Sequence, residues 1–243
     1  LTLDDSAELV AAGVADSAWI DRAALLATTV PGIRAYDATA LEHRDDRMRR
    51  DLSARLAPPD TVELQVTDGI GRLSGIAPMD WIGSLPGQVD LPNGRVVLEA
   101  DRLQPYEAVR LKALRRQIEQ VAIPFGDGAT LDPNQRPRIE SLAGLINELQ
   151  QHAVRLERRI RLHVIGRTDG IGTPEQNLFV ARERAMVVAE ALEAQGLALP
   201  DMELNVIDLP TRASGQTPDL RQRRVEFRLR DLGAGGAAQS VDR

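Results

Sequence analysis

Apolar residues recur along this chain in two rhythms, one typical of strands and one typical of helices. Ile160, Leu162 and Val164 alternate with polar residues, which predicts a strand that stops at Gly166. Further along, apolar residues keep helical spacing at Leu178, Ala181, Ala185, Val188, Ala189 and Leu192. The local order is strand, polar loop and helix, and similar patterns elsewhere predict an α+β protein built of two-layer α/β sandwiches.

The predicted helix has a well-marked start. Thr173 is placed as N-cap, Pro174 occupies the first helical position and Gln176 completes a capping box. Asp169 lies in the loop that feeds this helix, and Arg184 lies along the edge of its buried face. A carboxylate and a guanidinium at this place would suit a ligand that carries both an ammonium and a carboxylate group.

A simpler interpretation exists for the same two residues. An Asp ahead of a helix is often a turn or cap residue, and Arg184 could pair in solvent with Glu183 or Glu190. Spacing alone leaves both interpretations open.

The segment Thr168-Asp169, Gly172, Asn177 and Arg184-Ala185 resembles the signature of the OmpA-like C-terminal, peptidoglycan-binding domain family. The resemblance implies a βαβαββ-type domain over residues 122–232. It also implies that Asp169 and Arg184 bind the diaminopimelate of the peptidoglycan stem peptide. Two positions depart from the family pattern, because Arg167 stands where His is common and Val180-Ala181 replaces Leu-Ser.

Further site residues follow from the same resemblance. The loop Gly126–Ala129 is expected to form one wall of the pocket, and Gln222-Arg223-Arg224-Val225 stands where the family has Asn-Arg-Arg-Val. We expect one of these arginines to help bind the ligand carboxylate and at least one to be solvated at the strand edge. Besides the charge pair, the expected ligand-binding set is Thr168, Thr173, Asn177, Asp127, Gly128, Arg223 and Arg224.

Other elements of this domain can be placed by pattern. Strands are predicted at 123–125, 202–207 and 224–229, a helix from Pro133 to His152, a loop over 209–220, and a disordered tail over 233–243.

The first half of the chain contains an internal repeat. Gly13, Ala15, Trp19 and Ile20 recur 62 positions later as Gly75, Ala77, Trp81 and Ile82. We therefore predict two copies of one unit, at residues 1–60 and 61–121. Each copy is expected to read strand, helix, strand, helix, with charged final helices at about 42–56 and 106–120.

Details of the second copy can be predicted too. Asp68-Gly69 predicts a hairpin turn, and Pro86-Gly87 predicts that the helix after Trp81 is short or kinked. The unit resembles the BON module of envelope proteins, which implies binding of phospholipid or a protein partner. Trp19 and Trp81 fit either a ligand platform or, more simply, core anchors at the heads of helices.

Composition and motifs exclude several classes of function. The net charge of −6 argues against a nucleic-acid partner, and the absence of cysteine excludes disulfides and thiolate chemistry. The three histidines lie on separate predicted elements with no metal-site spacing, and no nucleophile elbow occurs. We therefore predict a non-enzyme with no cofactor. Low aromatic content, 3% of residues, favours recognition of the stem peptide over the glycan.

These expectations combine into one function prediction. The resemblance to the OmpA-like family implies a non-catalytic, periplasmic cell-envelope protein that attaches to peptidoglycan and is tethered to the outer or inner membrane. Because the chain starts at Leu1 with no Met or leader, and no apolar run approaches the roughly 18 residues of a membrane span, the tether is expected in a missing segment. Two alternatives stay open: an assembly module whose BON-like repeats bind a protein partner or phospholipid, and a component like the flagellar stator protein of the same family.

Overall fold

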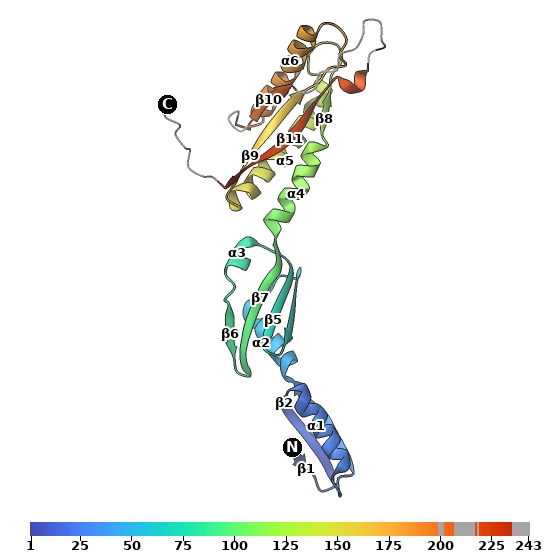
Figure 1. Cartoon of the computed structure of the whole chain (residues 1–243), viewed down its shortest axis with the longest axis vertical. Helices are drawn as coiled ribbons and strands as arrows, with labels where there is room; N and C mark the ends of the chain where they lie inside the picture. The colour runs from blue at the N-terminus through green and yellow to red at the C-terminus, as the bar shows by residue number, and fades with distance from the viewer. Residues whose placement is uncertain (199–201, 207–216, 218, 235–243) are drawn as a thin grey trace, which may run out of the picture. The chain divides into compact units, whose positions relative to one another are not determined.

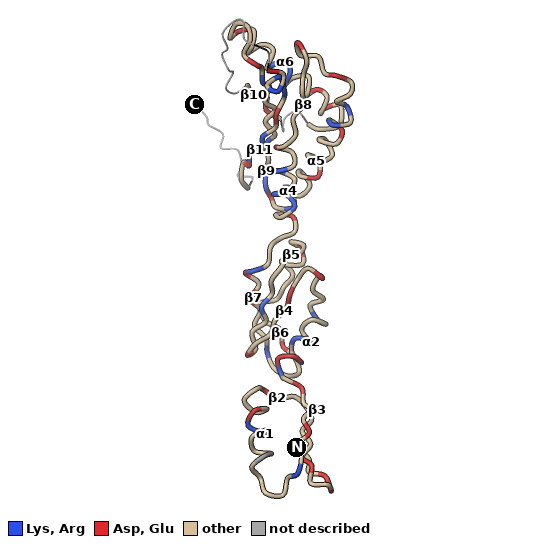
Figure 2. The backbone as a smooth tube through the Cα atoms, turned by 90° about the vertical axis from the view of Figure 1, so that its right-hand side faces the viewer, with Lys and Arg blue, Asp and Glu red and all other residues tan. Residues whose placement is uncertain are grey.

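The computed structural model describes residues 1–198, 202–206, 217 and 219–234. It is a mixed α+β protein, as the patterns predicted, and it divides into two compact units, Leu1–Tyr106 and Glu107–Arg243. Lys and Arg are interspersed with Asp and Glu along the backbone of both units (Figure 2). Within the described stretches, no helix combines the length and the apolar character that crossing a bilayer requires.

The N-terminal unit begins with a small lobe of three strands and one helix, here called the first lobe. It comprises β1 (Thr2–Leu3), β2 (Glu8–Ala15), α1 (Ser17–Thr29) and β3 (Ala35–His43). The sheet order is β1-β2-β3, with β1 antiparallel and β3 parallel to β2. Asp16 caps α1 by accepting a hydrogen bond of 2.8 Å from the Trp19 backbone N–H.

The second lobe follows with two helices and four strands. It comprises α2 (Arg44–Leu56), β4 (Val62–Thr67), β5 (Ile70–Ala77), α3 (Met79–Gly83), β6 (Gln88–Leu91) and β7 (Gly94–Pro105), in the sheet order β4-β5-β7-β6 (Figure 1). The predicted hairpin turn is confirmed, because Asp68 and Gly69 join β4 to β5 with φ of 50° and 76°. The short helix after the second repeat Trp is confirmed as well, since α3 has 5 residues and α1 has 13.

Strand pairing confirms the internal repeat residue by residue. In the first lobe Leu9 pairs with Tyr36 and Gly13 with Leu41; in the second lobe the pairs are Gly71 with Leu98 and Gly75 with Leu103. Every partner is displaced by the same 62 positions, and the register irregularity falls at the same place, between Val10 and Ala12 in one lobe and between Arg72 and Ser74 in the other.

The structure assigns α2 differently from the sequence. The repeat alignment placed residues 42–56 at the end of the first copy, whereas Met48 and Leu52 of α2 pack into the core of the second lobe with Val66, Val89 and Val96. The second lobe therefore begins with the helix α2, which the repeat alignment had placed at the end of the first copy. The reason is that charged helices look alike in sequence, and only packing shows which sheet they cover.

After its first helix, α4, the C-terminal unit has the βαβαββ order that was expected. Its elements are α4 (Tyr106–Glu119), β8 (Ala122–Pro124), the 3₁₀ turn η1 (Pro133–Gln135), α5 (Arg136–Arg155), β9 (Arg158–Gly166), α6 (Pro174–Glu193), β10 (Met202–Val206), the 3₁₀ turn η3 (Leu220–Gln222) and β11 (Arg224–Ala234). The sheet order is β10-β9-β11-β8, with β9 in the interior between its parallel neighbour β10 and its antiparallel neighbour β11.

One apolar core joins the sheet to the helices of this unit. It contains Leu162 and Val164 of β9, Val225 and Phe227 of β11, and the apolar faces of α5 and α6. Leu114 and Ile118 of α4 belong to the same core, so α4 is part of this unit, although the sequence alignment had included it in the second repeat.

Two expectations fall mainly outside the described residues. Residues 209–216 and 218 of the predicted loop are not described, nor is residue 207 of the predicted strand 202–207, and neither are residues 235–243 of the predicted tail. Gly233 and Ala234, which the sequence placed in that tail, are the last residues of β11.

Candidate functional site

The candidate site lies where β9 ends and α6 begins, and a glycine brings the two elements together. A Cβ built on Gly166 would overlap the carbonyl oxygen of Ala181 and would come within 2.6 Å of its carbonyl carbon. Only glycine permits this approach of helix backbone to strand backbone. As a result, the loop between β9 and α6 is held against the first turns of the helix.

The loop buries its two polar signature residues. Thr168 and Asp169 are 2% and 4% exposed, although they lie in a connection between elements. The predicted capping box is present, because Thr173 accepts from the Gln176 backbone N–H at 3.2 Å and Gln176 accepts from the Thr173 backbone N–H at 3.1 Å. The Asn177 amide donates to the carbonyls of Ile171 and Thr173, at 3.2 and 3.0 Å, so its role in the structure is to fasten the loop.

Arg184 is 2% exposed and joins α6 to two other backbone segments. Its Nε donates to the Gly128 carbonyl at 2.7 Å, Nη1 to the Arg167 carbonyl at 2.8 Å and Nη2 to the Gly126 carbonyl at 3.2 Å. The guanidinium also lies 5.5 Å from the ring centroid of Phe125. Burial, helped by the nearby positive charge of Arg223, lowers the pKa of Arg184 below the usual arginine value.

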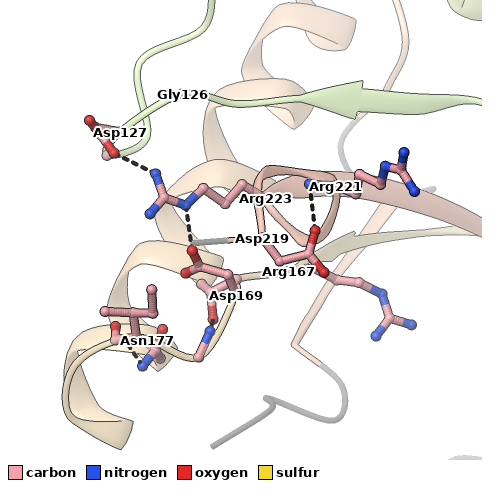
Figure 3. A network of polar contacts seen from close by, with 12 residues as sticks. Gly126, Asp127, Arg167, Asp169, Asn177, Asp219, Arg221 and Arg223 are labelled. Atoms are coloured by element: carbon pink, nitrogen blue, oxygen red, sulfur yellow. Dashed lines mark hydrogen bonds and ion pairs between the residues drawn. The ribbon is translucent and has the colours of Figure 1, made fainter. Parts of the chain in front are cut away.

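Arg223 reaches the same place from the end of η3 and lies between two carboxylates (Figure 3). Its Nε donates to Asp169 Oδ2 at 2.8 Å, and its Nη1 donates to Asp127 Oδ1. Partial burial acts to lower the pKa of Arg223, but the hydrogen bonds and charges of the two acids outweigh it and raise the pKa above its usual value. The two acids differ strongly in environment, because the Asp127 side chain is 98% exposed and that of Asp169 only 6%.

Arg224, the other predicted arginine, points elsewhere. Its Nε donates to Glu226 Oε1 at 2.7 Å, and Arg167 Nε donates to Glu226 Oε2 at 2.7 Å. Burial acts to raise the pKa of Glu226, but the hydrogen bonds from these two arginines prevail and lower it. Since Val225, between them in the strand, faces the core, Arg224 and Glu226 lie on the outer face of β11.

The structure thus brings together Asp127, Gly128, Asp169, Arg184 and Arg223, with Thr168, Thr173 and Asn177 shaping the loop. Among the described residues, no ion pair joins Asp169 to Arg184. Each is instead held by other groups. Such an arrangement offers one buried negative and two positive charges in fixed positions, which suits recognition of a dipolar ligand.

Two features of the site were not predicted from the sequence. The first is that Arg184 donates three of its five N–H groups to backbone carbonyls, those of Gly126, Gly128 and Arg167. The second is that Arg223 bridges Asp127 and Asp169. The sequence signal for the first was present in Gly126 and Gly128, because glycine leaves carbonyls accessible at a turn. No local signal indicates the second.

Comparisons with known proteins gave only structural likeness. No family model and no curated protein matches the sequence. Among solved structures, the chain resembles the peptidoglycan-associated lipoprotein of Burkholderia pseudomallei at 19% identity, over 45% of this chain and 89% of that one, with a TM-score of 0.37. It resembles the C-terminal domain of Helicobacter pylori MotB at 18% identity, over 45% and 84% of the chains, with a TM-score of 0.37. The OmpA-like domain of FopA1 from Francisella tularensis matches at 20% identity, over 46% and 74%, with a TM-score of 0.34.

Proposed function

We propose that the C-terminal unit binds peptidoglycan through the diaminopimelate of the stem peptide, and that the protein is a non-catalytic, periplasmic attachment to the cell wall. The observation that carries this proposal is a buried carboxylate, Asp169, whose charge acts on a buried guanidinium, Arg184, while its ion pair is made with Arg223 instead. Burying two charges costs free energy, so a site that keeps them apart is suited to a ligand that carries both opposite charges.

The geometry supports a specific distribution of roles. An ionised carboxylate has about four acceptor positions, and Arg223 takes one on Oδ2 of Asp169, so the acid can also accept a ligand ammonium. Arg184 has two N–H groups beyond those given to backbone carbonyls, and these can fork onto the ligand carboxylate. Arg223 then keeps the Asp169 carboxylate and the loop at Asp127 in fixed positions relative to each other while the ligand is bound.

The expected affinity fits attachment and not capture of a free ligand. Each charge-assisted hydrogen bond contributes roughly 1.5–3 kcal/mol net, so two or three correspond to micromolar to millimolar binding of one stem peptide. A polymer that presents many stem peptides at high local density compensates for this weakness, provided that the protein is confined near the wall.

The decisive experiment is co-sedimentation of the chain with purified sacculi, together with calorimetric titration of free diaminopimelate. Asp169→Asn and Arg184→Lys are expected to lose binding in both assays. Arg224→Gln is the matched control, because it removes a neighbouring guanidinium that is engaged with Glu226, and it should bind like the parent. Circular dichroism of each variant shows whether the fold is kept. Well-folded Asp169→Asn that still binds sacculi like the parent would refute the assignment.

A further inference from the structure

The first lobe carries an apolar groove beside α1. The groove has a volume of about 280 Å³ and is lined by Leu1, which precedes β1, by Leu9 of β2, and by Trp19, Leu26 and Val30 from α1 and its end. Arg22 is the charged residue in its lining. Apolar side chains are unusually open here, with Leu26 53% and Trp19 39% exposed.

The repeat shows what covers the corresponding face of the second lobe. Leu3 pairs with Leu9 in the first lobe, and Val66 pairs with Gly71 in the second, so Leu3 and Val66 are equivalent positions. Val66 is 9% exposed and packs in one core with Met48 and Leu52 of α2, whereas Leu3 is 62% exposed. The difference is that the described part of the first lobe has no helix in the place of α2.

Two further contacts of the second lobe are missing from the first. A Cβ on Gly75 would collide with the Thr61 carbonyl, because the chain that leads from α2 to β4 passes over this glycine, whereas Gly13 has open space around it. Trp81 donates its indole N–H to the Leu56 carbonyl at the end of α2, at 3.2 Å. Among the described residues, the Trp19 indole has no such partner.

We propose that this groove is the docking site of an amphipathic α-helix joined directly ahead of β1, in the place that α2 takes in the second lobe. The order of the repeat fixes the position, because α2 ends at Leu56 and β4 begins at Val62. The helix needs an apolar stripe like that of Met48 and Leu52, which lie four residues apart on one face. An acidic residue beside this stripe would pair with Arg22 at the rim.

The test uses the chain's own helix as the probe. A variant that joins a second copy of residues 44–63 directly to Leu1 places this helix in the register of the repeat, since Leu64 and Leu1 are equivalent. Tryptophan emission should shift to shorter wavelength and acrylamide quenching should fall, because Trp19 becomes covered. The same comparison in a Trp19→Phe background should show neither change, which assigns the signal to this residue.

Matched controls separate docking from mere extension of the chain. An extension whose copies of Met48 and Leu52 are changed to Asp should leave Trp19 as open as in the parent. Leu26→Asp in the groove should abolish the effect of the intact extension, and Leu25→Asp should not, because Leu25 is outside the groove lining and 65% exposed.

Three results would overturn the proposal. One is an intact extension that leaves Trp19 emission and quenching unchanged. Another is equal protection of Trp19 by the intact and the Asp-substituted extensions. The third is concentration-dependent dimerisation of the unextended chain that Leu26→Asp removes, which would identify a second copy as the occupant.

Discussion

Replacing Gly166 by alanine tests the contact on which the candidate site is built. The new methyl group would overlap the Ala181 carbonyl oxygen and approach its carbon to 2.6 Å. Carbon atoms pack at about 3.5 Å or more, so α6 has to retreat from β9 by about 1 Å. The obstacle is helix backbone, which cannot rotate away as a side chain would. We expect a loss of about 3 kcal/mol in the free energy of unfolding, the upper end of ordinary overpacking.

The retreat also reaches the binding residues. Arg184 lies on α6, and its hydrogen bonds to the Gly126, Gly128 and Arg167 carbonyls measure 2.7–3.2 Å. A displacement of about 1 Å takes the longer of these beyond the hydrogen-bonding range. Gly166→Ala should therefore weaken binding to sacculi even under conditions where the protein remains folded.

Urea denaturation followed by circular dichroism measures the effect. With a slope of about 2 kcal/mol per molar urea, 3 kcal/mol lowers the midpoint by about 1.5 M. Both tryptophans, Trp19 and Trp81, belong to the N-terminal unit, so their fluorescence transition is expected to stay in place. The matched control is Gly144→Ala in α5, where a Cβ has open space, and it should stabilise by up to about 1 kcal/mol through helix propensity. Equal midpoints for Gly166→Ala and the parent would refute the reasoning.

Three further predictions concern charges and backbone. Asp169→Asn should cost about 2 kcal/mol of stability, because the hydrogen bond that Asp169 accepts from Arg223 is buried. Asp127→Asn, at the exposed end of the same arginine, should cost under about 0.5 kcal/mol, and equal losses in urea melts would contradict this. Glu226→Gln should cost about 2 kcal/mol at pH 7. Because the folded-state pKa of Glu226 is lowered, this loss should shrink as the pH falls below the usual glutamate pKa and through the lowered folded-state pKa, and urea midpoints measured across pH check this. Gly75→Ala should cost more than about 2 kcal/mol, since φ is +123° and the Thr61 backbone blocks the methyl group; an unchanged tryptophan-detected melt would refute it.

Local signals in the sequence were sufficient for the elements around the site. The start of α6 depends on Thr173, Pro174 and Gln176, which are neighbours in the chain, and the structure reproduces the capping box. The repeat was visible because the paired strands keep their spacing. Both kinds of information are contained in short stretches of sequence.

Partners far apart in the chain were not visible. Arg184 binds carbonyls 56 and 58 residues away, and Arg223 binds Asp127 at a separation of 96 residues. The strand β6 was missed because residues 88–91 correspond, at the 62-position displacement of the repeat, to residues 26–29, which are helical in the first lobe. The assignment of α2 was wrong for a related reason, since its charged sequence does not reveal which sheet it packs against.

The helix α4 starts at Tyr106, which is 62 positions after the start of α2 at Arg44. The strands of the second lobe follow those of the first lobe at the same interval. Each helix follows the last strand of one module and is buried in the next, so the module boundaries fall at His43 and at Pro105. Whole modules can therefore be gained or lost between these boundaries without altering any core. Evolution could change the number of such modules by duplication or deletion of a single exchangeable segment.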